Sequence, residues 1–378
     1  MKRRDFLKKS GIGAASVAAA AVGAATLIGC EKKQEEEKKA KVEVGVKWRA
    51  GSTWTPAINL IETDRYFIKI VNQMAGGRMS ISHHPAGEIV GAFELFDAVS
   101  KGALEGGFDW PSYWSGKYSA FDLLGSVSFW FTPADYYTWV YQGGGLELIR
   151  ELFAKYNMYY IPTGMTPSES GFRTNKPIKS LEDYKGLKLR APLAQNMYIL
   201  QQIGANPVKL PGGEIYMALK LGTIDGAEFS NASADFGMKF AEVTKYWNVP
   251  CWFQPSSLLG LMINLDAWKK LPDDLKAIME EAGKATVLWG NAFGNWTDIA
   301  ATNDFIKQGT TITKLPPEDL AKLEKLSVQF MEIEAAKNPD YKKMVQSMMT
   351  YMKNYEIVRD WQGEWSFGRN PTIYPKLD

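Results

Sequence analysis

The sequence predicts an α/β protein with mainly parallel sheets and helices on both faces of each sheet. Strand-like and helix-like segments alternate along most of the chain, which is typical of this class. Hydrophobic residues make up 46% of the 378 residues, so the chain can build a sizeable core. A chain of this length is also long enough for two domains.

The first half of the chain begins this alternation with a strand followed by a helix. In residues 42–51, Val and Trp alternate with polar residues and Gly, and this period of two predicts a strand. Residues 56–74 carry apolar side chains at helical spacing and predict a helix. The same reasoning predicts strands at 77–87 and 158–164, and helices at 93–101 and 134–157.

The second half continues with shorter strands and longer helices. Residues 257–272 read as a strand that leads into a helix, and residues 273–309 form one long helical pattern. The rest of the chain is expected to be largely helical. Four short strands are expected at 170–175, 185–192, 206–211 and 224–230, with helices at 196–203 and 213–221 between them.

The N-terminal segment is predicted to be a processing signal and not part of the fold. MKRRDFLKKS contains a twin arginine and resembles a twin-arginine export signal. Residues 11–29 are uncharged but mostly Ala and Gly, which suits a signal better than a membrane span. LIGC, ending at Cys30, resembles a lipobox in which the cysteine is acylated. We therefore expect a signal at 1–29, a charged tether at 30–41, and a lipid-anchored protein on the periplasmic or cell-surface side.

Composition excludes several classes of partner. Removal of the signal takes away five basic residues and one acid, so the formal net charge changes from +2 to −2. A nearly neutral chain gives no electrostatic case for binding nucleic acid. The chain has only two cysteines. With Cys30 acylated, Cys251 is alone and no intrachain disulfide can form.

Catalytic motifs are hard to find in the sequence. The two histidines, His83 and His84, are adjacent and would point to opposite faces of a strand. Zinc-binding spacings, a nucleophile elbow and a Walker loop are all missing. This favours binding over catalysis. A secreted hydrolase that uses only carboxylates stays open, with Glu169 and Glu228 as its one candidate pair.

Two features point to a ligand. The strand KGLKLRAP places Arg190 at its carboxyl end, where ligands gather in α/β folds. A guanidinium offers a planar fork of donors that matches a carboxylate. Four aromatic residues lie close together in the sequence, Phe108, Trp110, Tyr113 and Trp114. They form either a wall of a binding site or part of the core.

Four further motifs, in this order and spacing, resemble those of one family. They are HHPAGEIVGAFELFDAVSKGALEGG, IKSLEDYKGLKLRAP, IGANPVKLPGGEIYMALKLGTIDGAEFS and LMINLDAWKKLP. From about residue 45 to 365 the chain resembles the extracytoplasmic solute receptors of tripartite ATP-independent periplasmic (TRAP) transporters. The resemblance implies a non-enzymatic receptor with a two-domain, type II-like periplasmic-binding-protein fold, a cleft between the lobes and a long helix spanning both. It implies domain I at 42–167 plus 255–295 and domain II at 168–254 plus 296–378.

The resemblance also implies the residues of the site. Arg190 matches the arginine that binds the substrate carboxylate, and Arg173 matches a second arginine of some members. Three features resemble those of the family branch that binds 2-oxo and 2-hydroxy acids together with a metal ion. They are GAEF at 226–229, the aromatic stretch 246–254, and the pair Tyr113 and Trp114. The walls of the site are expected to include Trp54, Phe108, Tyr113, Trp114, Glu169 and Trp252.

In that branch a cation, Ca2+ or Na+, would be held by the Glu228 side chain and the Phe229 backbone oxygen. Gln254 aligns with an acidic ligand of that branch, and Glu169 aligns with a glutamine ligand. The two residue types are therefore exchanged in this chain, while the total charge of the metal ligands is kept. Without a metal, Glu228 would brace Arg190. The alternative ligand is a dicarboxylate or a sugar acid bound without metal.

The resemblance also implies partners: a small organic anion, the membrane permease subunits, and in some members a second copy paired through C-terminal helices. A sensor that signals to another protein is an alternative to a transport receptor. An unpaired buried Arg190 would be costly, so the ligand-free protein is expected to stay open.

Overall fold

The computed structural model describes residues 45–362 and 373–377. The predicted signal at 1–29, the lipidated Cys30 and the tether up to residue 41 lie outside the described residues. Within the described part of the chain, no helix has the length and apolar character needed to cross a membrane.

The first sheet has five strands in the order β2-β1-β3-β10-β4. The strands β1, β2 and β3 run parallel, and β10 runs antiparallel to both β3 and β4. The strand bounds are β1 Val46–Ser52, β2 Met79–His84, β3 Gly106–Asp109, β4 Met158–Met165 and β10 Leu258–Asn264.

The second sheet has six strands in the order β11-β9-β5-β8-β6-β7. Here β5 runs antiparallel to β8 and β9, while the other pairs are parallel. The α/β class with mainly parallel sheets is therefore confirmed, although each sheet is mixed because it contains one reversed strand, β10 in the first sheet and β5 in the second. The strand bounds are β5 Phe172–Thr174, β6 Lys188–Arg190, β7 Asn206–Val208, β8 Gly226–Ala227, β9 Tyr246–Val249 and β11 Thr311–Lys314.

The helices follow the predicted pattern, with one break. The segment predicted as a helix at 134–157 forms two helices, because Gly144 between them adopts a left-handed backbone with φ of 80°. The helix bounds are α1 Ile61–Met74, α2 Leu95–Ser100, α3 Ala120–Gly125, α4 Pro133–Gln142, α5 Gly145–Ala154, α6 Ala194–Gln202, α7 Ile215–Lys220, α8 Ala232–Gly237, α9 Phe240–Val243, α10 Leu265–Lys270, α11 Asp273–Lys307, α12 Pro317–Lys337 and α13 Pro339–Gln362.

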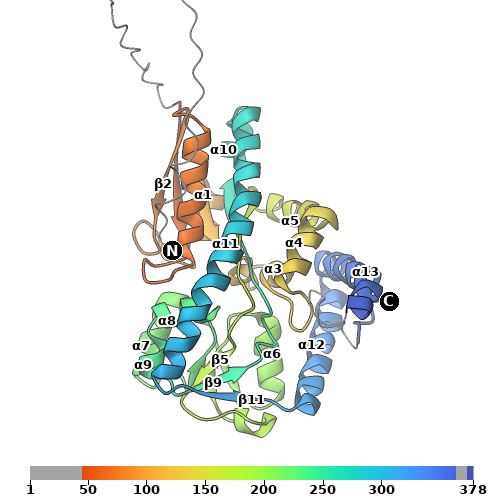
Figure 1. Cartoon of the computed structure of the whole chain (residues 1–378). Helices are drawn as coiled ribbons and strands as arrows, with labels where there is room; N and C mark the ends of the chain where they lie inside the picture. Colours follow the sequence, from red (N-terminus) through yellow and green to blue (C-terminus); the bar gives the residue numbers. More distant parts are fainter. Residues whose placement is uncertain (1–44, 363–372, 378) are drawn as a thin grey trace, which may run out of the picture. The chain divides into compact units, whose positions relative to one another are not determined.

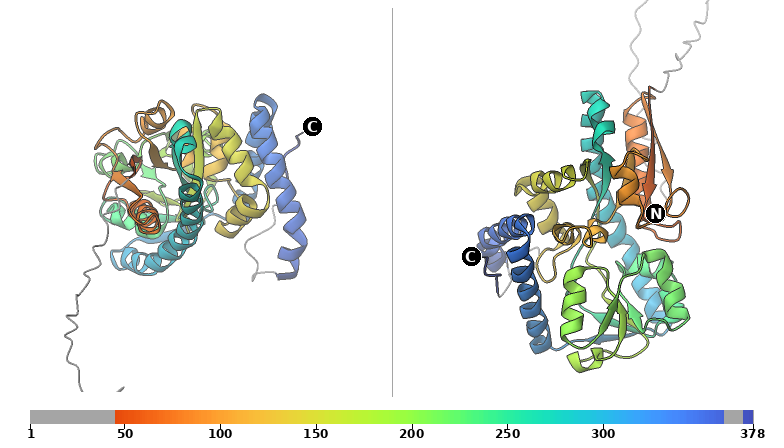
Figure 2. Two further views of the ribbon diagram at one scale, coloured as in Figure 1. Left: turned by 90° about the horizontal axis from the view of Figure 1, so that it is seen from above. Right: turned by 180° about the vertical axis from the view of Figure 1, so that it is seen from behind.

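The long helix α11 contacts elements of both sheets. Its first half packs on β4 and α1, and its second half packs on α8 (Figure 1). Gly283 approaches the backbone of Pro162 at the first sheet, whereas Phe305 contacts Trp247 of the second sheet. The C-terminal helices α12 and α13 pack together, and α13 lies against α3 and α5 (Figure 2). The boundaries of the two predicted domains stay a prediction.

Candidate binding site

A small enclosed cavity lies where loops at the ends of strands from both sheets come together. Its volume is small, about 10 Å³. Arg190 reaches it from the end of β6, and Trp54 reaches it from the loop after β1. Its walls are formed by Trp54, Leu60, Trp110, Tyr113, Thr166, Glu169, Arg190, Phe229, Ser230, Gln254, Ser257 and Leu259.

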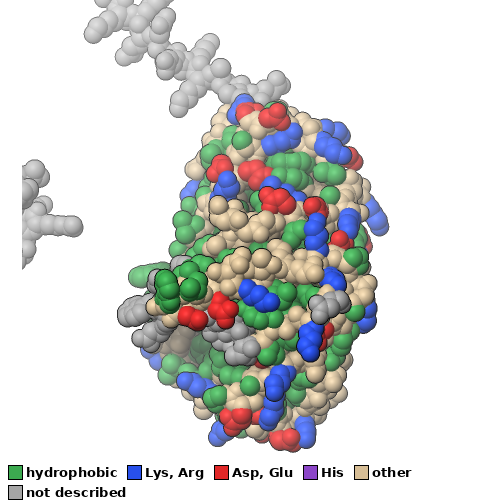
Figure 3. All heavy atoms as spheres, turned by 90° about the vertical axis from the view of Figure 1, so that its right-hand side faces the viewer, with side chains coloured by type: hydrophobic (Ala, Val, Ile, Leu, Met, Phe, Trp, Pro, Cys, Tyr) green, Lys and Arg blue, Asp and Glu red, His purple; other side chains and the backbone are tan. Residues whose placement is uncertain are grey.

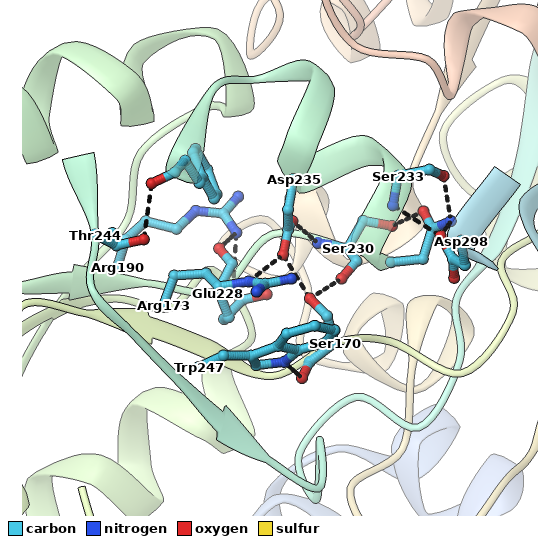
Figure 4. A network of polar contacts seen from close by, with 12 residues as sticks. Ser170, Arg173, Arg190, Glu228, Ser230, Ser233, Asp235, Thr244, Trp247 and Asp298 are labelled. Atoms are coloured by element: carbon cyan, nitrogen blue, oxygen red, sulfur yellow. Dashed lines mark hydrogen bonds and ion pairs between the residues drawn. The ribbon is translucent and has the colours of Figure 1, made fainter. Parts of the chain in front are cut away.

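Arg190 is held in this cavity by three hydrogen bonds. Its side chain is 1% exposed. Nη1 donates to the backbone oxygen and to Oε1 of Glu228, both at 2.8 Å, and Nε donates to the Leu210 oxygen at 3.1 Å (Figure 4). The Phe229 ring lies 5.4 Å from the guanidinium carbon. Glu228 and the backbone oxygens therefore neutralise and solvate the buried charge of Arg190, and the expectation that the ligand-free protein stays open remains a prediction.

Glu228 pairs with Arg190 through only one of its two oxygens. Burial raises the pKa of Glu228 to about 7, against the opposing effect of Arg190. Its second oxygen, Oε2, is buried and has no hydrogen-bond partner among the described residues. A buried polar atom without a partner is costly, and it marks a place where a ligand or ion would be stabilised.

Glu169 and Gln254 add further oxygen atoms to the same cavity. The Thr166 hydroxyl donates to Glu169 at 3.2 Å. Burial, and then the neighbouring Glu228, raise the pKa of Glu169 well above its usual range. Gln254 donates from Nε2 to the Ser257 hydroxyl at 2.8 Å, while its Oε1 has no partner in the described part of the chain. Among the described residues, no group of three or more His, Cys, Asp or Glu is placed to hold a metal ion. The oxygen atoms near Arg190 come from two carboxylates, Glu228 and Glu169, and one amide, Gln254.

Arg173, the second predicted arginine, does not line the cavity. Its Nε donates to Asp235 at 3.0 Å, and its guanidinium lies between the Trp247 and Phe305 rings at 3.7 and 3.8 Å (Figure 4). Burial lowers the pKa of Arg173 to about 10. Asp235 also accepts a hydrogen bond from Ser170, so the pair joins β5 and the loop that precedes it to α8.

Three of the predicted aromatic wall residues lie in the core. The Phe108 ring packs against Phe67 of α1, on the opposite face of β3 from the cavity. The Trp114 indole donates to the buried Asp109, and Trp252 stacks on Phe129. The aromatic side chains that do line the cavity are Trp54, Trp110, Tyr113 and Phe229.

Hydrogen bonds hold Trp54 in its wall position. Its backbone N–H donates to the Ser52 hydroxyl at 3.0 Å, and that hydroxyl donates to Asp64 at 2.7 Å. The ring nitrogen Nε2 of His83 lies 3.2 Å from the same carboxylate. His84 pairs instead with the exposed Glu88. Neither histidine lines the cavity, and His83 supports the wall from behind.

Several wall residues were missed at the level of sequence. Leu60, Thr166, Ser257 and Leu259 carry no motif, and they meet only after folding. Thr166 follows β4 and Ser257 precedes β10. The Ser257 backbone N–H donates to the Thr166 hydroxyl at 2.7 Å, and the Thr166 backbone N–H donates to the Ser257 carbonyl oxygen at 2.9 Å. Pairing between such distant segments leaves no local pattern in the chain.

The fold and the cavity define a class of protein. Two α/β sheets share an enclosed cavity with one buried arginine, and no histidine or cysteine in the described part of the chain lines it. This arrangement is typical of a solute-binding receptor.

The chain belongs to the bacterial extracellular solute-binding proteins of family 7, whose family model matches residues 50–353. It is 30% identical over 354 residues to the monocarboxylate 2-oxoacid-binding periplasmic protein of Nostoc sp., covering 93% of this chain and 94% of that protein. The resemblance to TRAP receptors and the two-lobe α/β fold are thereby confirmed, and the hydrolase alternative is rejected because the family consists of receptors.

Two solved structures support the same assignment. A TRAP transporter solute-binding protein from Bordetella bronchiseptica, a dimer with calcium and picolinate in its site, matches with a TM-score of 0.81 and 28% identity. One from Pseudoalteromonas atlantica, with bound sodium and pyruvate, matches with a TM-score of 0.79 and 28% identity. Each match covers 85% of this chain and 97% of the other chain.

Proposed function

We propose that this protein captures a small 2-oxo or 2-hydroxy carboxylate together with a cation and delivers it to a TRAP permease. The observation that carries the proposal is the buried cluster around Arg190. It combines the positively charged guanidinium of Arg190 with two buried oxygen atoms, Glu228 Oε2 and Gln254 Oε1. Both oxygen atoms lack hydrogen-bond partners among the described residues. The relatives that bind 2-oxo acids, pyruvate and picolinate support this ligand class.

The residues that line the cavity, together with Glu228 beside Arg190, fit a hard cation such as Ca2+ or Na+. Glu228, Glu169, Gln254 and the backbone oxygen of Phe229 would hold it, since carboxylate, amide and carbonyl oxygens are its preferred ligands. When bound, the ion supplies positive charge to the 2-oxygen of the acid. Arg190 would bind the carboxylate, and Trp54, Tyr113 and Phe229 would exclude water around it.

A monocarboxylate fits this cavity better than a dicarboxylate. Arg190 is the one basic residue among the described residues that line it, and the other charged group is Glu169. A second carboxylate would meet no second cationic side chain there, and only neutral donors such as Trp110, Tyr113 and Ser230 would compensate for its desolvation. The dicarboxylate and sugar-acid alternative is therefore not favoured.

The cellular setting is also a proposal. We infer export by the twin-arginine route, acylation at Cys30 and a partnership with membrane permease subunits. A homodimer is proposed from the dimeric Bordetella relative. On the face shown in Figure 3, basic and acidic side chains are interspersed, which supports a small anion rather than nucleic acid as the partner.

A thermal-shift panel tests the proposed ligand class. Pyruvate, 2-hydroxypropanoate, succinate and galacturonate are added with calcium, with sodium, or after removal of both ions. A ligand at about 100 times its Kd adds about 2.7 kcal/mol of stability. We expect the 2-oxo and 2-hydroxy acids to stabilise the protein only when an ion is present. Equal stabilisation without any ion would exclude the cation, and a response to succinate alone would exclude the ligand class.

A further inference from the structure

A loop that follows the second sheet packs closely against a segment that follows a strand of the first sheet. Residues 209–213 come directly after β7, and a Cβ atom on Gly212 would lie 3.1 Å from Cδ1 of Ile58. A Cβ atom on Gly213 would lie 2.9 Å from Cγ2 of Thr55. Thr55 and Ile58 lie between β1 and α1. Because the two glycines lack side chains, the loop can approach this segment closely.

Lys209 begins this loop and binds a wall residue of the cavity from outside. Its ammonium donates a hydrogen bond to the backbone oxygen of Tyr113 at 2.8 Å, across 96 positions of the sequence. Its Nζ also lies 5.7 Å from the centre of the Phe93 ring, which packs edge-to-face on Tyr113 with ring centres 5.2 Å apart. Tyr113 belongs to the 3-10 helix Pro111–Trp114 after β3, and it lines the cavity. Lys209 therefore joins the loop after β7 of the second sheet to a wall residue that follows β3 of the first.

The hydrogen bond of Lys209 is strengthened by the charge of its donor. Lys209 is half-buried, and this burial lowers its pKa against the opposing effect of the nearby Asp122. A hydrogen bond from a charged group typically changes an equilibrium constant by about tenfold to a hundredfold. A second hydrogen bond joins the same segment after β1 to α8, from Asn59 Nδ2 to the Ser233 hydroxyl at 3.0 Å. Neither of its partners is charged, so the Lys209 bond is the stronger of the two.

We propose that Lys209 is an interlobe latch, a positioning residue whose bond to Tyr113 holds the closed conformation and slows the release of the ligand. Lys209 is not among the residues that line the cavity. Its bond depends on the distance between the lobes, because donor and acceptor follow strands of different sheets. Since the cavity is enclosed, a ligand leaves only when the lobes separate, and this separation breaks the bond. The inference goes beyond the proposed function, because it concerns how long a ligand stays bound.

Release kinetics test the latch. Stopped-flow tryptophan fluorescence can follow binding, because Trp54 and Trp110 line the cavity. The observed rate is measured against pyruvate concentration at saturating calcium, so that the slope gives the association rate constant and the intercept gives the dissociation rate constant. We expect Lys209→Met to raise the dissociation rate constant about tenfold to a hundredfold, while the association rate constant changes less than about threefold.

A conservative variant and a control assign the effect to the ammonium. Lys209→Arg keeps a charged donor and should return the dissociation rate constant to within about threefold of the wild type. Lys220→Met is the matched control, because Lys220 is an exposed lysine on the next α-helix, α7. An unchanged dissociation rate in Lys209→Met would overturn the latch. So would a loss of affinity that lies only in the association rate and fades with added salt, because Lys209 would then act by attracting the anion.

The outcomes separate this inference from the proposed function. If the wild type binds pyruvate and Lys209→Met releases it at the same rate, only the latch is refuted. If the wild type binds none of the 2-oxo and 2-hydroxy acids, the proposed function fails, and small-angle scattering of the ligand-free proteins decides the latch. Lys209→Met should then have the larger radius of gyration, and equal radii refute the latch. Should Lys209→Met not fold in a thermal melt, the neutral Lys209→Gln takes its place, and an unchanged dissociation rate there also refutes the latch.

Discussion

At the scale of single residues, Glu228 has two roles that the sequence kept apart as alternatives. Its Oε1 braces Arg190 in the ligand-free protein, while its Oε2 has no partner among the described residues. We infer that an incoming carboxylate replaces the Glu228 oxygen at Arg190, and that a cation then satisfies Glu228. Anion and cation would therefore bind cooperatively, because each compensates the group that the other displaces.

Arg190→Ala should abolish the ligand response. Removal of the guanidinium leaves no positive group in the cavity to pair with a carboxylate, and Glu228 can take up a proton because its pKa is already about 7. We expect the variant to fold, with no thermal shift on addition of pyruvate and calcium. The exposed Arg65→Ala is the control. A shift in Arg190→Ala equal to that of the wild type would remove Arg190 from the site.

The stability of the ligand-free protein should depend on pH through Glu228. The pKa of this carboxyl group is raised from 4.5 in the unfolded reference to about 7 in the folded chain, chiefly by burial. Between these values the folded state holds a proton that the unfolded state lacks, so stability decreases as pH rises from about 4.5 to about 7.

Thermal melts from pH 5 to pH 8 check this dependence. Glu228→Gln keeps an acceptor for Arg190 but does not titrate, so its melting temperature should fall less steeply over this range. The stabilisation by calcium and pyruvate should show the opposite trend and increase with pH, because the ion binds the ionised carboxylate. Identical pH profiles for the wild type and Glu228→Gln would contradict the assignment.

At the scale of elements, Arg173 joins β5 of the second sheet to α8 and α11. The guanidinium lies between Trp247 and Phe305 and pairs with Asp235, and both charged side chains are fully buried. This arrangement positions the backbone around Ser230, which lines the binding cavity and whose N–H donates to Asp235 at 3.2 Å. Arg173 is therefore placed to hold Asp235, and through Asp235 the backbone of Ser230, in position.

Asp235→Asn should destabilise the protein more than it weakens binding. Loss of the charge leaves Arg173 buried without a counter-ion, which typically costs about 3–5 kcal/mol. Chemical denaturation measures this loss, and calorimetry below the unfolding transition measures Kd for pyruvate. We expect Kd to change far less than stability. A large loss of affinity with unchanged stability would instead make Arg173 a ligand-binding arginine.

At the scale of the whole molecule, the class of the fold and the position of Arg190 could be predicted because local patterns encode them. Alternation in 185–192 and the break at Pro192 place Arg190 at the end of a strand whatever the strand packs against. Register was harder to predict. The reversed strands β5 and β10, and the short strands β9 and β11, depend on partners far along the chain.

The aromatic residues show the same limit. Phe108 and Trp110 are two positions apart, yet the first packs on α1 and the second lines the cavity, because β3 ends between them and the chain turns into a 3-10 helix. The order of residues gives no measure of which aromatic side chain faces a ligand. Only the packing of the first sheet against α1 separates the core from the wall.

The sequence by itself determined the α/β class, the receptor family and the residues Arg190 and Glu228, because these depend on short motifs and local spacing. The tertiary structure alone decided that Glu228 pairs with Arg190, and that Arg173 pairs with Asp235 outside the cavity. The physical reason is that burial and pairing arise between residues that are far apart in the sequence, 38 positions for Arg190 and Glu228 and 62 for Arg173 and Asp235. No single stretch of the sequence shows which buried charges are neutralised or where a cavity lies.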